Sequence, residues 1–169
     1  MQTMVLDYQP TAAPRSLAEL AAVTDNPLLL RFFEQWLMLT GDGAFPPADA
    51  FEPEGPDFAR GQVVIVDLVG APPRFRFRHV GEKLIPFAGL DMTGKWVDEL
   101  PNLEHRRATL EGYRWVAEHA RPAYASSKRE RNRKPYFYEA LRLPLSRDGR
   151  TVDRLVSCTS YALRMIDLV

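Results

Sequence analysis

The segment that most restricts the fold is residues 27–40, a predicted helix that must be covered on nearly every side. Asn26 can cap this helix, Pro27 suits its first position, and Gly41 follows as a stop. Large apolar side chains occupy almost the whole helix surface and leave only a narrow polar stripe, which consists of Arg31, Glu34 and Gln35. A helix of this composition is buried in the folded protein, whatever covers it.

Two interpretations of this helix stay open. It lies across a sheet under other cover, or it forms the interface of a homodimer. In the second case the contacts with the partner copy would come from its most apolar side chains, Leu29, Phe32, Phe33, Trp36 and Leu37. Both interpretations bury the helix, so the sequence does not choose between them.

The segments on either side of this helix lack a regular pattern. Residues 1–25 contain Pro10, Pro14 and several alanines, and we expect a flexible arm with one weak helix near residues 17–23. Residues 41–61 are rich in proline, glycine and acidic residues, which is typical of an extended connector. Regular structure is therefore expected to resume at residue 62.

Two groups of β-strands are predicted after the connector. Residues 62–69 are a β-branched run, and in residues 74–80 aromatic residues and His79 alternate with arginines, so these two strands form a hairpin. Asp148-Gly149 supplies a turn between the last two strands of the second group. The strands of that group are predicted at residues 123–127, 136–145 and 154–163.

Helical segments separate the two groups of strands. Residues 82–88 indicate a short helix, residues 89–100 are rich in turns, and a second long helix is capped by Asn102 and ended by Pro122. This order predicts an α+β fold in which one antiparallel five-stranded sheet carries helices on one face, with the apolar N-terminal helix added. We expect a single domain over residues 26–169, with its core at residues 62–169.

Several local strings in this framework resemble the PAS fold, and within it a family of small proteobacterial PAS-like proteins. They are Phe45-Pro46-Pro47 with Phe51-Glu52-Pro53, the string from Phe75 to Gly81, and the string from Gly89 to Lys95. The resemblance implies a five-stranded antiparallel sheet that cups a helical segment and often a small ligand. None of these strings is a catalytic signature, and His79 stands where the family pattern leads us to expect an apolar residue.

Motifs for catalysis and for metal binding fail on inspection. Residues 89–95 match a phosphate-binding loop up to Lys95, but Trp96 stands where that loop needs Ser or Thr to hold magnesium. His105 and His119 share one predicted helix, where fourteen residues at about 1.5 Å each place them roughly 20 Å apart, too far for one ion. No Gly-x-Ser-x-Gly string is present. We therefore expect no enzymatic activity and no metal.

Cys158 is the only cysteine, which excludes an intrachain disulfide and a cysteine cluster for zinc or iron–sulfur. It lies on a predicted strand, whereas flavin photosensor domains use a cysteine on a helix. A haem-binding PAS domain would take its axial histidine from the helix that carries His105 and His119, but no other haem pattern accompanies them. The cofactor is therefore unknown, and we expect neither haem nor flavin.

A ligand cavity is predicted beside the second strand. Phe75, Phe77 and His79 share the face of that strand that should point inward, although a hydrogen-bonded core histidine is the alternative interpretation of His79. The complete set of predicted ligand contacts adds aromatic residues from later segments and the cysteine: Phe75, Phe77, His79, Trp96, Tyr113, Tyr138 and Cys158.

The charge balance argues against partners that would bind through the overall charge of the chain. Lys plus Arg and Asp plus Glu both count 22, so the whole chain has no charge that attracts nucleic acid. Residues 128–134 are a basic run, which we interpret as a solvated hairpin tip because it lacks aromatic residues that stack on bases; an acidic protein surface or a phosphate-bearing ligand is the alternative. Without a leader or an apolar run of membrane-spanning length, we expect a cytoplasmic protein.

These features together predict a sensory module. The domain would bind a small molecule, pair as a homodimer, and pass its signal to a histidine kinase or another regulatory protein. The alternatives are an interaction adaptor without a ligand and a small cone-shaped α+β enzyme, which would need His79 beside a buried acid such as Glu139.

Overall fold

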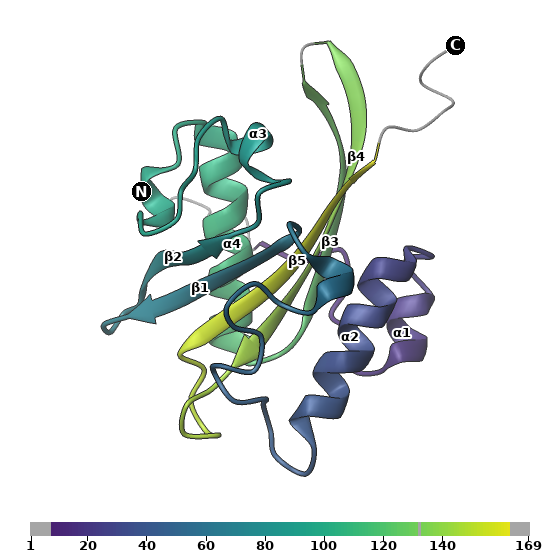
Figure 1. Cartoon of the computed structure of the whole chain (residues 1–169), viewed down its shortest axis with the longest axis vertical. Helices are drawn as coiled ribbons and strands as arrows, with labels where there is room; N and C mark the ends of the chain where they lie inside the picture. Colours follow the sequence, from purple (N-terminus) through teal and green to yellow (C-terminus); the bar gives the residue numbers. More distant parts are fainter. Residues whose placement is uncertain (1–7, 132, 163–169) are drawn as a thin grey trace, which may run out of the picture.

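The computed structural model describes residues 8–131 and 133–162 and is built around one five-stranded antiparallel sheet (Figure 1). The strand order is β2-β1-β5-β4-β3, so the two early strands join the three late ones through the β1–β5 pair. The strands are β1 (Val63–Val69), β2 (Arg74–Val80), β3 (Ala123–Arg131), β4 (Lys134–Leu145) and β5 (Arg154–Ala162). The predicted fold class, α+β with one five-stranded antiparallel sheet and an added apolar N-terminal helix, is confirmed.

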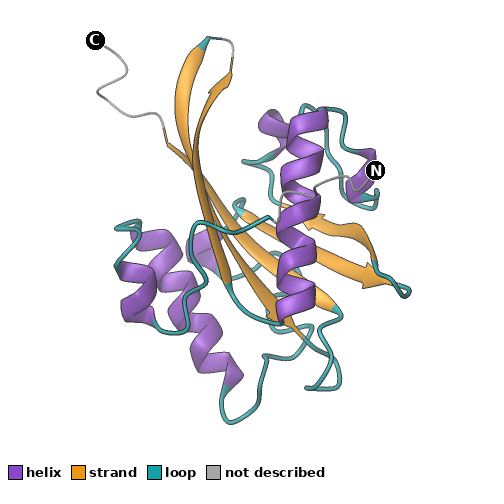
Figure 2. Ribbon diagram, turned by 180° about the vertical axis from the view of Figure 1, so that it is seen from behind, coloured by secondary structure: helices purple, strands orange, loops and turns teal. Residues whose placement is uncertain are grey.

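Helices cover both faces of this sheet (Figure 2). One face carries α1 (Leu17–Ala21) and α2 (Pro27–Thr40), and the other carries α3 (Ile85–Ala88) and α4 (Leu103–His119). Two short 3₁₀ helices, Asp57–Ala59 and Val97–Glu99, lie in the connecting segments. No helix within residues 8–131 and 133–162 is long and apolar enough to cross a membrane.

The two faces of the sheet build two separate cores. Val63 and Ile65 of β1 pack in the core under α2, whereas Val64 and Val66 pack in the core under α4. Alternate residues of a strand point to opposite faces, and a strand covered on both faces needs apolar residues throughout. The continuous β-branched run of β1 is explained by its position between these two helical layers.

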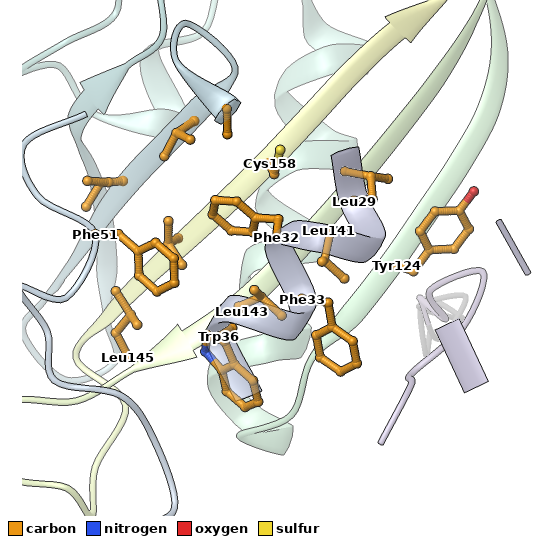
Figure 3. Close-up of a cluster of buried hydrophobic side chains, with 14 of the residues drawn as sticks. Leu29, Phe32, Phe33, Trp36, Phe51, Tyr124, Leu141, Leu143, Leu145 and Cys158 are labelled. Carbon is orange, nitrogen blue, oxygen red and sulfur yellow. The ribbon is translucent and has the colours of Figure 1, made fainter. Parts of the chain in front are cut away.

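Helix α2 begins and ends where the sequence predicts. The Asn26 side chain accepts a hydrogen bond from the Leu28 amide at 3.0 Å, and Pro27 occupies the first turn. Figure 3 shows the inner face of α2 packed on the sheet. The Trp36 indole donates a hydrogen bond to the Pro144 carbonyl at 3.0 Å. Each large apolar side chain buried in this way contributes roughly 1.5–3 kcal/mol.

This packing settles the two interpretations of α2 in favour of sheet cover. The residues assigned to a homodimer interface face the protein's own core: Leu29, Phe32, Phe33 and Trp36 are buried there, and Leu37 is half-buried against the same cluster. They are therefore not available to a partner copy. The sequence could not show this because the covering strands, β4 and β5, begin 94 and 114 residues after the end of α2.

The N-terminal arm also differs from its prediction, because residues 8–25 are not loose. Ala12 and Tyr124 exchange two backbone hydrogen bonds at 3.0 and 2.8 Å, which places the arm against the open edge of β3. Leu20 of α1 is fully buried. Residues 1–7 of the predicted arm lie outside the described residues.

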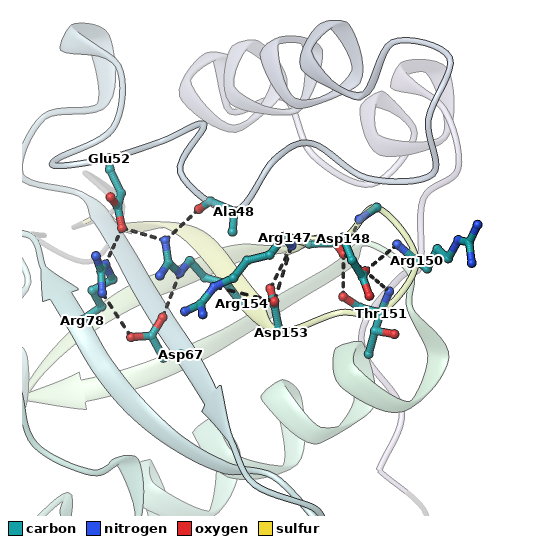
Figure 4. A network of polar contacts seen from close by, with 12 residues as sticks. Ala48, Glu52, Asp67, Arg78, Arg147, Asp148, Arg150, Thr151, Asp153 and Arg154 are labelled. Carbon is teal, nitrogen blue, oxygen red and sulfur yellow. Dashed lines mark hydrogen bonds and ion pairs between the residues drawn. The ribbon is translucent and has the colours of Figure 1, made fainter.

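The connector between α2 and β1 is fixed to the sheet by a buried polar network (Figure 4). Arg154 of β5 donates through Nε to Asp67 at 2.8 Å, and through Nη1 to Glu52 at 2.6 Å and to the Ala48 carbonyl at 3.0 Å. Arg78 also contacts Glu52 and Asp67. A segment without regular structure is therefore held by ion pairs, not by apolar packing alone.

The basic run at residues 128–134 is not a hairpin loop as predicted. β3 and β4 remain paired out to Arg131 and Lys134, so Lys128, Arg129 and Glu130 belong to a strand hairpin that projects beyond the rest of the sheet (Figure 1). Pairing with β4 satisfies the backbone of these polar residues, which explains why a charged sequence adopts a strand.

Candidate functional site

A small cavity of about 50 Å³ lies between α4, α3 and the sheet face that they cover. Strands β1, β2, β4 and β5 supply its floor, and the two helices with the turns around them supply its cover. Its lining combines apolar and polar side chains: Val64, Phe77, Val80, Leu84, Ala88, Met92, Leu100, His105, Thr109, Tyr113, Tyr138, Arg142, Ser157, Thr159 and Tyr161.

Part of the predicted ligand set meets in this cavity. Phe77 of β2, Tyr113 of α4 and Tyr138 of β4 all line it, and each is nearly fully buried. Phe75 faces the same core, where its ring lies 5.9 Å from that of Tyr113, but it does not reach the cavity. The predicted inward face of β2 is therefore correct at Phe75 and Phe77.

His79, in contrast, is placed outside the cavity by a β-bulge. Val66 of β1 pairs with Phe77 and Ile65 pairs with His79, so Arg78 is an extra residue on β2. An extra residue switches every following side chain of the strand to the opposite face of the sheet. Val80 therefore points into the cavity, and His79 points away from it. His79 lies in a surface cleft with Asp91 and Thr93 instead.

Trp96 and Cys158 were also assigned to the cavity, and neither lies there. Trp96 packs on the outer side of β2, where the guanidinium groups of Arg74 and Arg76 lie 4.1 and 5.5 Å from its ring. Cys158 points to the opposite face of the sheet, into the core under α2. Its neighbours Ser157 and Thr159 take the cavity side, as strand alternation requires.

The most informative cavity residue is one that the sequence interpretation missed, Arg142 of β4. It is only 4% exposed, and its Nη2 donates to the Tyr138 hydroxyl at 3.0 Å. Ser157 of β5 lies directly opposite it in the sheet register. Strand alternation along β4 places Arg142 on the same face as Tyr138 four residues earlier, and this signal could have found it.

The space that Arg142 occupies depends on a glycine in the facing helix. A Cβ added to Gly112 of α4 would lie 2.5 Å from Nη1 of Arg142 and 2.8 Å from its Cζ. Any larger residue at this position would displace the guanidinium. Gly112 carries a helix-propensity cost of about 1 kcal/mol relative to alanine, and its packing against Arg142 explains why glycine stands there.

The charge states around the cavity follow from burial. Desolvation alone would lower the pKa of Arg142, but Tyr138, Tyr8 and Tyr113 outweigh it and the pKa is raised, so Arg142 stays cationic. Burial, with smaller effects from Arg129 and Arg142, lowers the pKa of His105, which is therefore neutral at neutral pH. Burial raises the pKa of Tyr113 and Tyr161, so their hydroxyls keep their protons.

An open groove of about 630 Å³ adjoins the cavity and shares His105 and Tyr161 with it. Its walls come from α3, the start of α4 and the projecting hairpin. The Phe87 ring of α3 stacks on Tyr161 at 3.7 Å, and the Arg129 guanidinium lies 3.8 Å above the Tyr138 ring. These stacked rings form the wall between the groove and the cavity.

Two chemical arrangements that the sequence raised are not formed. Across residues 8–131 and 133–162, no group of three potential metal ligands comes together. His79 on β2 and Glu139 on β4 are separated by β1 and β5, or about 14 Å at ordinary strand spacing. Glu139 instead accepts hydrogen bonds from Thr24, Tyr124 and Asn26. The pair that the enzyme interpretation required is therefore absent.

Comparisons with known proteins give distant likenesses of fold. No protein-family profile matches the chain, and no curated protein sequence matches it either. Among solved structures, a light-oxygen-voltage (LOV) domain studied with a flavin analogue is 14% identical with a TM-score of 0.42, over 59% of this chain and 76% of its own. A variant of the RsLOV protein is 12% identical with a TM-score of 0.43, over 63% of each chain.

A fungal LOV photoreceptor linked to blue light and oxidative stress is 13% identical with a TM-score of 0.40, over 68% of this chain and 81% of its own. Likenesses at this distance do not transfer a ligand, an activity or a partner to this chain.

Proposed function

We propose that this chain is a PAS-type sensory module that binds a small molecule in the cavity between α4, α3 and the sheet. The observation that carries the proposal is a partly open cavity whose lining includes buried polar side chains, Thr109, Ser157 and Arg142 among them. A core that served only for packing would fill this space with apolar side chains, because buried polar groups need partners. On the local strings of its sequence, we place the chain with the small proteobacterial PAS-like proteins.

The sheet offers a route from the cavity to the rest of the molecule. On β4, Tyr138 and Arg142 line the cavity, whereas the intervening Glu139 and Leu141 face the N-terminal helices. Glu139 is held there by Thr24 and Asn26, which lie at the junction of α1 and α2. A shift of β4 on ligand binding would therefore move α1 and α2, and we propose that a regulatory protein binds at these helices.

A homodimer remains part of the proposal but needs a different surface from the one first expected. The exposed large apolar residues near α2 are Val23, Met38 and Leu39. A histidine kinase or another signalling protein would compete for the same region.

Flavin is a candidate ligand because one of the neighbours was studied with a flavin analogue. The residues as placed do not fit it: the cavity holds about 50 Å³, whereas sites for ligands of drug size hold roughly 300–1,000 Å³. No cysteine stands among the described residues that line it. A flavin would need α3 to move outward, and the visible absorption of the purified protein reports directly whether one is bound.

The experiment is native mass spectrometry of the protein purified from the organism that makes it, compared with the same sample denatured. We expect an added mass that disappears on denaturation. The Thr109→Met variant, which fills the cavity from α4, should lose the added mass, and Glu118→Met on the exposed side of the same helix should keep it. A protein mass without any adduct in the wild type would instead favour the interaction adaptor.

A further inference from the structure

Two arginines of this protein are equally buried, and only one of them has an acidic partner. Arg142 and Arg154 are each 4% exposed. Arg154 is paired with Asp67 and Glu52. Among the ion pairs of residues 8–131 and 133–162, none involves Arg142. Buried charges in proteins are paired or bind a counter-ion, so the missing anion of Arg142 needs an explanation.

The described neighbours of Arg142 include no carboxylate that pairs with it. The Tyr138 hydroxyl accepts one of its hydrogen bonds, the Tyr8 side chain forms another, and the Tyr113 ring lies 5.5 Å from its Cζ. These groups are tyrosines, so none of them supplies the anion that a buried guanidinium ordinarily has. Glu139 is a buried acid three residues before Arg142 on β4, but it faces the other side of the sheet. Arg142 lines the cavity, so its guanidinium can meet a ligand there.

The rest of the lining suits a ligand with one anionic end. Thr109, Ser157 and Thr159 add hydroxyl donors, and Ser157 lies directly opposite Arg142. Seven other lining residues are apolar, with Phe77, Leu84, Met92 and Leu100 among them, and the rest are His105 and three tyrosines. At about 10–15 Å³ for each water, 50 Å³ corresponds to roughly three to five waters, which matches the volume of a short organic acid.

We propose that the ligand of this cavity is a small organic carboxylate, whose anionic group pairs with the guanidinium of Arg142 and whose short hydrocarbon end contacts Phe77 and Leu84. The inference rests on the proposed function, because it names the chemical class of the molecule that the sensory cavity binds. Arginine is suited to this role because its planar N–H groups match the two oxygens of a carboxylate.

The test is isothermal titration calorimetry, which measures the heat of binding when the whole protein is titrated with acetate, propanoate or butanoate at constant ionic strength. The controls are propanamide and 1-propanol, which keep the shape without the charge, and chloride and phosphate, which keep the charge without the hydrocarbon end. We expect binding of one or more of the carboxylates and no binding of the controls. Equal binding by the amide, by chloride or by phosphate would overturn the carboxylate assignment.

Variants locate the binding to Arg142. Arg142→Met keeps the length and removes the charge, and we expect it to weaken carboxylate binding by at least about 30-fold. Arg147→Met, at an exposed arginine outside the cavity lining, should bind as the wild type does. An unchanged affinity in Arg142→Met would overturn the proposal.

Gly112→Ala provides a second variant that keeps the arginine and all charges. Its added Cβ displaces the guanidinium, so we expect weaker carboxylate binding, whereas Gly43→Ala, whose Cβ meets nothing closer than 3.4 Å, should leave binding unchanged. This pair stays informative even where Arg142→Met fails to fold. Wild-type affinity in a folded Gly112→Ala protein would count against the role of Arg142.

The two proposals fail in different ways. A neutral molecule retained in native mass spectrometry, with no carboxylate binding, would overturn the ligand class and leave the sensory function in place. A protein without a retained mass that binds none of the titrated compounds would remove both.

Discussion

At the scale of single residues, Cys158 shows how its position in the sheet determines reactivity. The thiol is fully buried under α2, and burial raises its pKa from 9.0 to about 12. The thiolate is the reactive form, and at pH 8 only about one thiol in ten thousand would be ionised at that pKa. We therefore expect the native protein to react with a thiol reagent far more slowly than the protein unfolded in guanidinium chloride. Rapid reaction of the native protein would contradict the buried position.

The same shift makes stability depend on pH. Above pH 9.0 the unfolded protein loses the thiol proton while the folded protein keeps it up to a pH of about 12, so stability falls as pH rises through this window. By pH 10 the loss amounts to about 1.4 kcal/mol. Urea unfolding at pH 8 and pH 10 measures it, and Cys158→Ala should show a smaller loss between the two because only the tyrosine contributions remain.

At the scale of elements, Arg154 holds the connector that joins α2 to β1. Arg154→Ala would leave Asp67 buried without its partner and release Glu52 and Ala48. Removal of one member of a buried ion pair costs about 3–5 kcal/mol. We expect a loss of that size in urea unfolding, together with faster amide hydrogen exchange in residues 48–55.

Arg147 is the matched control for this prediction. It pairs with Asp153 at 3.7 Å, but its side chain is 67% exposed. An exposed pair contributes about 0–1 kcal/mol, so Arg147→Ala should lie within that range. If the two arginine variants lost equal stability, the network around Arg154 would not be what holds the connector.

The positions of individual helices and strands were the features that the sequence predicted most accurately. Caps and periodicity placed α2 and α4, and alternation placed β2, because these signals are local: Asn26 and Asn102 cap their helices by hydrogen bonds within the next three residues. The predicted direction of a side chain was wrong where one extra residue changed the strand register, as at His79 beyond the bulge. β4 gave no visible alternation because residues on both of its faces are buried.

The candidate site was harder to predict because it depends on long-range pairing. Arg142 and Ser157 become neighbours only when β4 and β5 align, and Gly112 meets Arg142 only when α4 packs on that face. Its spacing from Tyr138 gives the face on which Arg142 lies, but nothing near it in the sequence indicates that it is buried without an acid. Tyr113 and Tyr138 were predicted because large aromatic residues are buried in most settings.

At the scale of the whole molecule, the two cores share one sheet. β1 and β5 each send alternate side chains into the core under α2 and into the core under α4. β4 sends Leu141, Leu143 and Leu145 into the core under α2, and its Tyr138 and Arg142 line the cavity on the other face. Neither helical layer can be removed without exposing the apolar residues of the sheet on that face. We therefore expect the two helical layers to be stable only together. This holds even though the chain links α1 and α2 to the sheet only through the connector between α2 and β1.

Tryptophans placed in different cores allow this expectation to be tested. Trp36 lies in the core under α2 and Trp115 in the core under α4, while Trp96 packs outside β2. In one variant Trp96 and Trp115 are replaced by phenylalanine, and in another Trp36 and Trp96 are replaced. Because the cores share strands β1 and β5, we expect the fluorescence transition and the circular dichroism transition in urea to coincide within each variant, as in two-state unfolding. If Trp36 fluorescence changed at a lower urea concentration than the circular dichroism, the α1–α2 layer would unfold separately, and that would mark it as the movable element through which a signal leaves the domain.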